Sequence, residues 1–223
     1  MSDEQRSGAP DPETTDGASV PHAGVRPAPG AAGPADDRRL RAALEAYRRR
    51  FPGESETVDR FLALAAEGPA SFSRESLHAH FTGSAVVLDR IGTQVLLTHH
   101  AKLNAWLQLG GHADGDRDLR RVALREASEE SGLPASAFSR PTHDIVDLDI
   151  HRIPARAEVP EHYHFDVRFL LVADPAAPVV VSDESHDVKW VDVAQLASYS
   201  SEHSLFRAIE KAAGALREVL GLE

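Results

Sequence analysis

The spacing of hydrophobic residues changes twice in the first third of the chain. Up to about residue 36 there is almost no large apolar side chain, and Pro, Gly, Ala, Ser and Asp predominate. Such a segment cannot offset the entropy lost on ordering. From Asp37 to Ala65, apolar residues recur three and four apart on either side of a Pro52-Gly53 break, which is typical of amphipathic helices. The pattern predicts a disordered tail over residues 1–36 and a helical extension over residues 37–80.

The rest of the chain mixes strand-like and helix-like patterns. Two β-rich runs at residues 84–88 and 94–98 bracket a short polar connection and predict a hairpin. Further strands are expected at residues 143–151, 163–172 and 187–191, and an amphipathic helix from Leu205 closes the chain. This order predicts one α/β domain over residues 81–223, an α/β/α sandwich with a mixed β-sheet.

Composition narrows the class of protein. A chain of 223 residues with 42% hydrophobic residues can bury a hydrophobic core large enough for one main domain. The net charge of -11 argues against a general nucleic-acid or membrane-surface binder. The absence of cysteine excludes disulfides, thiolate catalysis and Cys-ligated zinc. Without an apolar run that could span a bilayer, we expect a cytoplasmic protein with no nucleic-acid or membrane partner.

The stretch from Leu109 to Leu133 concentrates the charged chemistry. On a helix, Glu126, Glu129 and Glu130 lie close together along one side, where they repel one another. A bound divalent cation would turn that repulsion into ligation. Arg125 lies one turn from Glu129 and would orient that carboxylate. The segment therefore suggests a hard-metal site.

Glycines flank this helix. Gly110 and Gly111 precede it and can bring bare backbone close to a ligand. Gly132 follows it and suits the left-handed residue that ends a helix. The predicted order is loop, helix, loop.

The segment resembles the Nudix box: Gly, five residues, Glu, seven residues, then Arg-Glu-U-x-Glu-Glu-x-Gly-U, where U is bulky and aliphatic. The residues that match in register are Gly111, Arg125, Glu126, Glu129, Glu130, Gly132 and Leu133. Arg117 stands where the first Glu is expected, and Ala127 stands where a bulky aliphatic residue is expected. Asp114, Asp116 and Asp118 lie near enough in sequence to supply a substitute carboxylate.

The resemblance implies the Nudix fold and divalent-metal-dependent hydrolysis of a pyrophosphate bond in a nucleoside diphosphate linked to another moiety. The implied cofactor is Mg²⁺ or Mn²⁺, and the partner is a small-molecule diphosphate. Expected metal ligands are Glu126, Glu129, Glu130, the Gly110 carbonyl and Asp116. Glu129 and Glu184 are the candidates for the catalytic base, while Arg125, Gly111 and Gly132 have structural roles.

Basic residues outside the box are candidates for binding the substrate. Lys102 precedes the box and could neutralise a phosphate, whereas Trp106 is expected to be a core residue. Arg168 shares one strand face with His164 and Asp166, from which it could bind a phosphate or acidic group. His112 follows the glycines directly and is also expected to meet the ligand.

Several histidines lie on segments that could converge near the box: His99, His100, His112, His151, His162 and His164. They could form a second, softer metal site. However, no pair has the helical four-residue spacing, with Glu between, of a zinc hydrolase. We therefore favour hydrogen-bonding and pocket-lining roles.

Two alternatives stay open at this stage. The change of charge at Arg117 is compatible with a catalytically weak Nudix-like sensor or regulatory module that binds a nucleotide ligand without cleaving it. The helices before residue 80 are expected either to cover one face of the domain or to form the contact of a homodimer.

Overall fold

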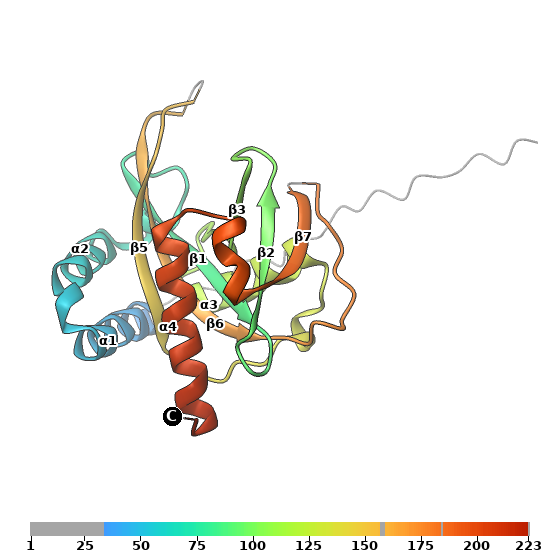
Figure 1. Cartoon of the computed structure of the whole chain (residues 1–223). Helices are drawn as coiled ribbons and strands as arrows, with labels where there is room; N and C mark the ends of the chain where they lie inside the picture. The colour runs from blue at the N-terminus through green and yellow to red at the C-terminus, as the bar shows by residue number, and fades with distance from the viewer. Residues whose placement is uncertain (1–33, 157–158, 184, 223) are drawn as a thin grey trace, which may run out of the picture.

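The computed structural model describes residues 34–156, 159–183 and 185–222 (Figure 1). Most of the predicted tail, residues 1–33, and the predicted base Glu184 lie outside these ranges. The helices are α1 (Pro34–Arg50), α2 (Ser55–Ala66), α3 (Leu119–Ser131) and α4 (His203–Leu220), with short 3-10 helices η1 (Pro52–Glu54), η2 (Gly68–Phe72), η3 (Ala135–Ala137) and η4 (Val193–Ser198). The strands are β1 (Ala79–Leu88), β2 (Gln94–His100), β3 (Ala105–Leu107), β4 (Leu109–His112), β5 (Ile145–Ile153), β6 (His162–Val172) and β7 (Ser185–Asp192).

The strands form the mixed sheet that the sequence predicts. Its order is β3-β2-β1-β6-β5, with β4 also paired to β1 and β7 to β2. Strands β1 and β6 are parallel, whereas the other pairs are antiparallel. The predicted hairpin of β1 and β2 pairs only at its closed end, through Val87 with Leu96 and Leu88 with Val95. Towards its start, β1 has β4 as its neighbour instead.

The two faces of β1 show how the sheet is covered. Phe81, Ala85 and Val87 point to one face and join a core with the apolar residues of α1, α2 and α3. Val86 and Leu88 point to the other face and join a second core with α4. Figure 1 shows α4 crossing the sheet, with α1 and α2 packed beside β5. Helices on both faces make this an α/β/α arrangement, as predicted.

The helices before residue 80 are part of the main core. Phe61 of α2 is 0% exposed, and its ring centroid lies 5.1 Å from that of Phe165 and 6.1 Å from that of Phe81. Leu44 and Tyr47 of α1 are buried in the same core. The expectation that these helices cover a face of the domain is therefore confirmed, while a homodimer stays a prediction.

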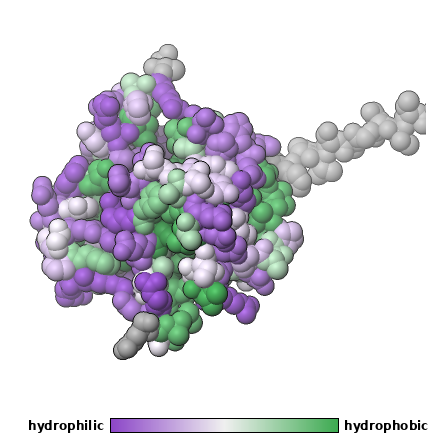
Figure 2. All heavy atoms as spheres, viewed as in Figure 1, coloured by the Kyte–Doolittle hydropathy of each residue, from purple (hydrophilic) through white to green (hydrophobic). Residues whose placement is uncertain are grey.

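The outer surface is mostly hydrophilic on the face that Figure 2 shows. Hydrophobic side chains gather near the C-terminal end of α4, where Val219, Leu220 and Leu222 are exposed. Within the described ranges, no helix is long and apolar enough to cross a bilayer.

A buried ion cluster attaches α4 to the sheet. Asp147 of β5 is fully buried and accepts hydrogen bonds from Arg168 of β6 at 3.1 Å and from Arg207 and Lys211 of α4, both at 2.9 Å. Unpaired, a carboxylate at such a depth would be strongly destabilising. These three cations explain why Asp147 is tolerated there.

Arg168 is central to this cluster, and its surroundings give no support to the substrate-binding role expected for it. Its side chain is 3% exposed, and its guanidinium donates to Asp147, to Asp166 at 2.8 Å and to the Ser204 carbonyl at 2.9 Å. It also lies 3.3 Å from Asp149. A guanidinium whose donors are taken by buried carboxylates is not available to a phosphate, so Arg168 has a structural role.

We predict that Phe61→Ala lowers the free energy of unfolding by about 3–5 kcal/mol, because a fully buried ring is removed from the core. Urea denaturation followed by circular dichroism measures this difference. The matched control is Leu77→Ala, since Leu77 is 61% exposed and its truncation should cost less than about 0.5 kcal/mol. Equal losses in the two variants would mean that the extension is not part of the cooperative core.

A second prediction concerns the acid stability of the ion cluster. Burial by itself would raise the pKa of Asp149, but the hydrogen bond from His151 and the charges of Arg168 and Arg207 lower the pKa well below its ordinary value. The folded protein therefore holds this proton less tightly than the unfolded chain, whose Asp pKa is about 3.9. The resulting stabilisation is present above that pH and is lost as the pH falls further.

Asp149→Asn should therefore lower stability at neutral pH and flatten the decrease in unfolding free energy between about pH 5 and pH 3. Urea denaturation at a series of pH values compares the two slopes. Parallel curves for the variant and the wild type would contradict the assignment.

Candidate active site

Helix α3 carries the three glutamates, and it ends at Gly132 as the sequence predicts. Gly110 and Gly111 lie on strand β4, not in the loop that was expected before the helix. The Asp118 side chain accepts a hydrogen bond from the Arg121 amide, and Gly132 ends the helix with φ of 69°. The helix packs directly on the backbone of β1, because a Cβ atom at Gly83 would lie 2.7 Å from the Leu119 carbonyl oxygen. Ala127, on the same helix, is fully buried in the main core.

The glycines of β4 permit a second close approach. A Cβ atom at Gly111 would lie 2.5 Å from Oε2 of Glu126, and a Cβ atom at Gly110 would lie 2.2 Å from Oγ of Ser84. The carboxylate of Glu126 therefore lies against bare backbone. Burial raises the pKa of Glu126, and the hydrogen bond and charge of Arg125 oppose that rise.

Arg125 connects the helix to the last residue of β4. Its Nη2 atom donates to the His112 carbonyl at 2.9 Å and to Oε1 of Glu126 at 2.7 Å. Its Nε atom lies 4.0 Å from Glu129, so the predicted pairing one turn away is the weaker contact. The orienting role proposed for Arg125 thus acts mainly on Glu126.

Gly110 presents its backbone to the third glutamate. Its amide donates to Oε2 of Glu130 at 2.9 Å. The Ala113 amide donates to the Phe81 carbonyl. Residues of an antiparallel pair alternate between hydrogen-bonded and non-hydrogen-bonded positions, so in this register the amide and carbonyl of Gly110 point away from β1. Its carbonyl points to the same side as its amide, and therefore towards the side on which Glu130 lies.

The three carboxylates differ in their access to solvent. The side chain of Glu126 is 17% exposed, whereas that of Glu129 is 56% exposed. Glu130 is held at its carboxylate by the Gly110 amide. One helix thus brings two anchored carboxylates and one accessible carboxylate to the edge of β4. This set of hard oxygen donors fits a Mg²⁺ or Mn²⁺ ion.

Asp116 is used in another way than expected. It is 4% exposed, and its two carboxylate oxygens accept hydrogen bonds from Nε and Nη2 of Arg121 at 2.6 and 2.5 Å. One of them also accepts the Asp118 amide. Asp116 therefore stabilises the turn into α3, and the geometry gives no support to its expected role as a metal ligand.

Arg117, the residue that departs from the box, binds the N-terminal extension. Its Nη1 atom donates to Asp37 of α1 at 2.8 Å. The neighbouring Asp114 accepts two hydrogen bonds of 2.6 Å from Arg74, which follows η2. The loop between β4 and α3 is thus tied to the extension at two points. Neither Asp37 nor Arg74 was identified by the sequence pattern, because both contacts cross between distant segments.

The residues before the box lie on the strand pair β2 and β3. Lys102 is exposed in the turn between these strands, and its role at a phosphate stays a prediction. Trp106 packs against the second core. The His99 ring stacks on it at 4.9 Å, and the Lys189 ammonium lies 4.5 Å from its centroid. Trp106 is therefore a partly buried residue packed against the core, and not one of its fully buried members.

His112 lies between the glutamates and a group of histidines. Its carbonyl is bound to Arg125, and its ring lies 5.2 Å from that of His80 and 4.9 Å from that of His164. Burial and the charge of Arg74 lower the pKa of His112 to about 4. A neutral ring at this position can donate or accept a hydrogen bond. His80 was absent from the histidines expected to converge here, because only the pairing of β1 with β6 brings it in.

One family model matches more than half of the chain. The family model described as the NUDIX domain matches residues 79–212, which span the whole sheet, α3 and half of α4 but neither α1 nor α2. No match was found among curated proteins.

Similar solved structures share little sequence with this chain. A C. elegans Ap4A hydrolase in a binary complex is 15% identical and covers 62% of this chain and 98% of its own, with a TM-score of 0.46. The E. coli dihydroneopterin triphosphate pyrophosphohydrolase is 18% identical and covers 59% and 92%, with a TM-score of 0.47. The NUDIX domain of Shewanella oneidensis NrtR, complexed with ADP ribose, is 19% identical and covers 68% and 97%, with a TM-score of 0.43.

We predict that Gly111→Ala weakens Mn²⁺ binding by about 10-fold or more, the range expected when a ligand loses its supporting contacts. The new methyl group would displace the Glu126 carboxylate from its place against β4. Titration calorimetry with Mn²⁺ measures the change. Gly214→Ala is the matched control, since a Cβ built there meets no atom within 4 Å beyond its chain neighbours and the nearby backbone of its own helix. Unchanged Mn²⁺ affinity in Gly111→Ala would separate Glu126 from the metal site.

Proposed function

The chain belongs to the NUDIX family and is an enzyme that acts on phosphorus-containing anhydrides, and from this premise we propose that it hydrolyses the pyrophosphate bond of a nucleoside diphosphate linked to another moiety, with Mg²⁺ or Mn²⁺ as cofactor. One observation carries the proposal. Glu126 and Glu130 are anchored against the backbone of β4, and Glu129 stands accessible beside them.

The residues of this edge fit the implied metal. Glu126, Glu129, Glu130 and the Gly110 carbonyl would hold it, and all four offer oxygen atoms, which Mg²⁺ and Mn²⁺ prefer. The raised pKa of Glu126 reflects a buried carboxylate whose charge a cation would stabilise. When bound, such an ion would neutralise charge on the phosphate oxygens and lower the pKa of a water.

The protein groups have separate tasks in this scheme. Arg125 holds the Glu126 carboxylate and the His112 carbonyl in place, while the Gly110 amide holds Glu130. Glu129 is the most exposed of the measured carboxylates, so we propose that one of its oxygens faces the metal and the other accepts the proton of the attacking water. We propose His112 and Lys102 as groups that bind the diphosphate, and Glu184 as a second candidate for the base.

We predict that Glu129→Gln and Glu130→Gln each lower the Mg²⁺-dependent rate by at least about 100-fold, since a metal contributes several kcal/mol to the transition state. A panel of nucleoside diphosphate derivatives is assayed with Mg²⁺ and with Mn²⁺, and the products are identified. Glu210→Gln is the matched control, because Glu210 is exposed on α4. Full turnover in both site variants, with the fold intact by circular dichroism, would overturn the assignment.

A second candidate function rests on Arg117. At this position the box motif has a carboxylate, but here the Arg117 guanidinium stands, paired with Asp37. A module that binds a nucleotide ligand without cleaving it would tolerate this change. The same panel separates the two functions. The binding module would be favoured over the hydrolase if calorimetry shows saturable binding of a derivative and no hydrolysis product forms with either Mg²⁺ or Mn²⁺.

A further inference from the structure

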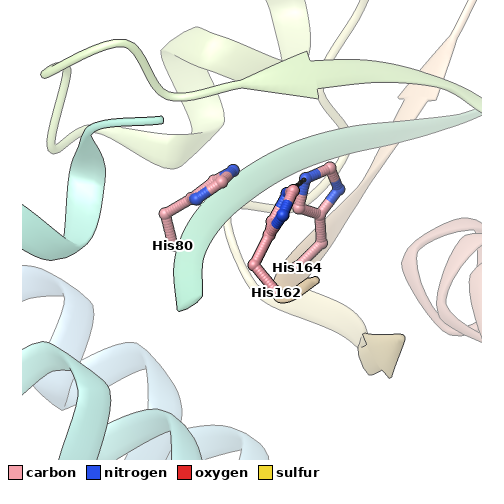
Figure 3. Close-up of side chains that lie close together, drawn as sticks. All are labelled: His80, His162 and His164. Atoms are coloured by element: carbon pink, nitrogen blue, oxygen red, sulfur yellow. Dashed lines mark hydrogen bonds between the residues drawn. The ribbon is translucent and has the colours of Figure 1, made fainter. Parts of the chain in front are cut away.

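Three histidines gather on the face of the sheet that also carries α4. They are His80 of β1 and His162 and His164 of β6, and one ring nitrogen from each lies within 4.8 Å of the others. Figure 3 shows their side chains close together, with the hydrogen bond between His162 and His164 drawn as a dashed line. These residues are separate from the glutamates of α3.

The fold brings the three side chains together through strand register. Parallel pairing of β1 with β6 places His80 directly beside His164. His162 precedes His164 by two residues, so both project from the same face of β6. The antiparallel partner of His164 on β5 is His151, whose ring centroid lies 5.3 Å from that of His164. Adjacent strands thus carry the imidazoles to one place.

Backbone carbonyls select the tautomer of two of these rings. Nδ1 of His80 lies 3.2 Å from the Ser76 carbonyl oxygen, and Nδ1 of His162 lies 2.9 Å from the Pro160 carbonyl oxygen. A carbonyl only accepts, so both Nδ1 atoms carry the proton. In these two neutral rings the lone pair is then on Nε2. The hydrogen bond between the Nε2 atoms of His162 and His164 is therefore donated by His164, and His164 would carry its proton on Nδ1 instead when its Nε2 binds a metal. Histidines that bind metals are commonly oriented in this way, with the other ring N–H donated to a carbonyl or carboxylate.

The Nε2 atom of His80 has no hydrogen-bond partner within the part of the chain that the structure describes. The residue is 2% exposed, so bulk water does not readily compensate. A buried polar atom without a partner costs free energy, and native proteins rarely leave one. His80 therefore points to a ligand that accepts its lone pair.

Burial is the largest influence on the pKa of His80 and of His164, and it lowers both. For His80 the hydrogen bond with the Ser76 carbonyl opposes this change, and the charge of His162 adds to it. Arg74 and Asp114 also act on the cluster, with opposite effects on the pKa of His80.

We propose that the Nε2 atoms of His80, His162 and His164 form a binding site for a divalent transition-metal ion of the Zn²⁺ class, separate from the oxygen site on α3. Imidazole nitrogen suits Zn²⁺ and its neighbours, whereas Mg²⁺ prefers oxygen. Tetrahedral Zn²⁺ with bonds of 2.0–2.1 Å holds its ligand nitrogens about 3.3–3.4 Å apart. The Nε2 atoms of His162 and His164 already lie 3.3 Å apart.

The proposed site adjoins the glutamates through His112. The His112 ring contacts His80 and His164, while its carbonyl is bound by Arg125. Three protein ligands leave a fourth position of a tetrahedral ion for an exogenous ligand. An ion there would add positive charge beside the place where an anionic substrate is proposed to bind.

The test is Zn²⁺ binding by chelator-treated full-length protein, measured by calorimetry in excess Mg²⁺. We expect wild type and the triple variant Glu126→Gln, Glu129→Gln and Glu130→Gln to bind Zn²⁺ equally well. His80→Asn and His162→Asn should each weaken binding by at least about 10-fold, the lower end of what loss of even a supporting partner costs. His203→Asn is the matched control, since His203 is exposed at the start of α4.

A Co²⁺ spectrum of the wild type provides a test without any substitution. Co²⁺ bound by three imidazoles in a tetrahedral site absorbs strongly in the visible, whereas six oxygen ligands give only weak bands. Circular dichroism of each metal-free variant checks its fold. Three results would each overturn the proposal. They are no Zn²⁺ binding in excess Mg²⁺, loss of Zn²⁺ binding in the triple glutamate variant but not in the histidine variants, and weak Co²⁺ bands of the octahedral type.

Discussion

The close packing of α3 on the backbone of β1 and β4 is the constraint on which the candidate site depends. Side chains at Gly83 and Gly111 would collide with the helix or with the Glu126 carboxylate, so glycine is required for the carboxylates to reach the strand edge. The approach lets main-chain groups act as partners: the Gly110 amide binds Glu130, and the His112 carbonyl binds Arg125. The glutamates are therefore positioned by backbone, which is more rigid than a side-chain contact.

The second face of the sheet is divided between apolar and polar halves. Val86, Leu88 and the apolar side of α4 form a core at one end, and buried ions and histidines occupy the other. Arg168 lies at the boundary, where it joins Asp147 to the start of α4 through the Ser204 carbonyl. In this arrangement the buried carboxylate of Asp147 is neutralised by neighbouring cations. It also leaves the polar half beside β4, where the candidate sites lie.

The N-terminal extension has a role beyond covering the core. It binds the loop before α3 through Asp37 with Arg117 and through Arg74 with Asp114. The departure of Arg117 from the box motif thus has a physical explanation, because an arginine there reaches α1. The loop carries fixed ion pairs in place of a further carboxylate ligand, so the metal-binding groups supported by the geometry belong to α3 and β4.

The sequence alone predicts those features that depend on the local periodicity of its residues. A helical repeat places Glu126, Glu129 and Glu130 together whatever surrounds them, and the order of strand and helix patterns determined the sandwich. Which elements become neighbours is decided by packing between distant segments. The geometry therefore gives no support to the expectation for Arg168, since a period of two assigns a face but not the carboxylates that share it. Likewise, His80 meets His162 and His164 only because β1 and β6 pair in parallel, a register that no local pattern encodes.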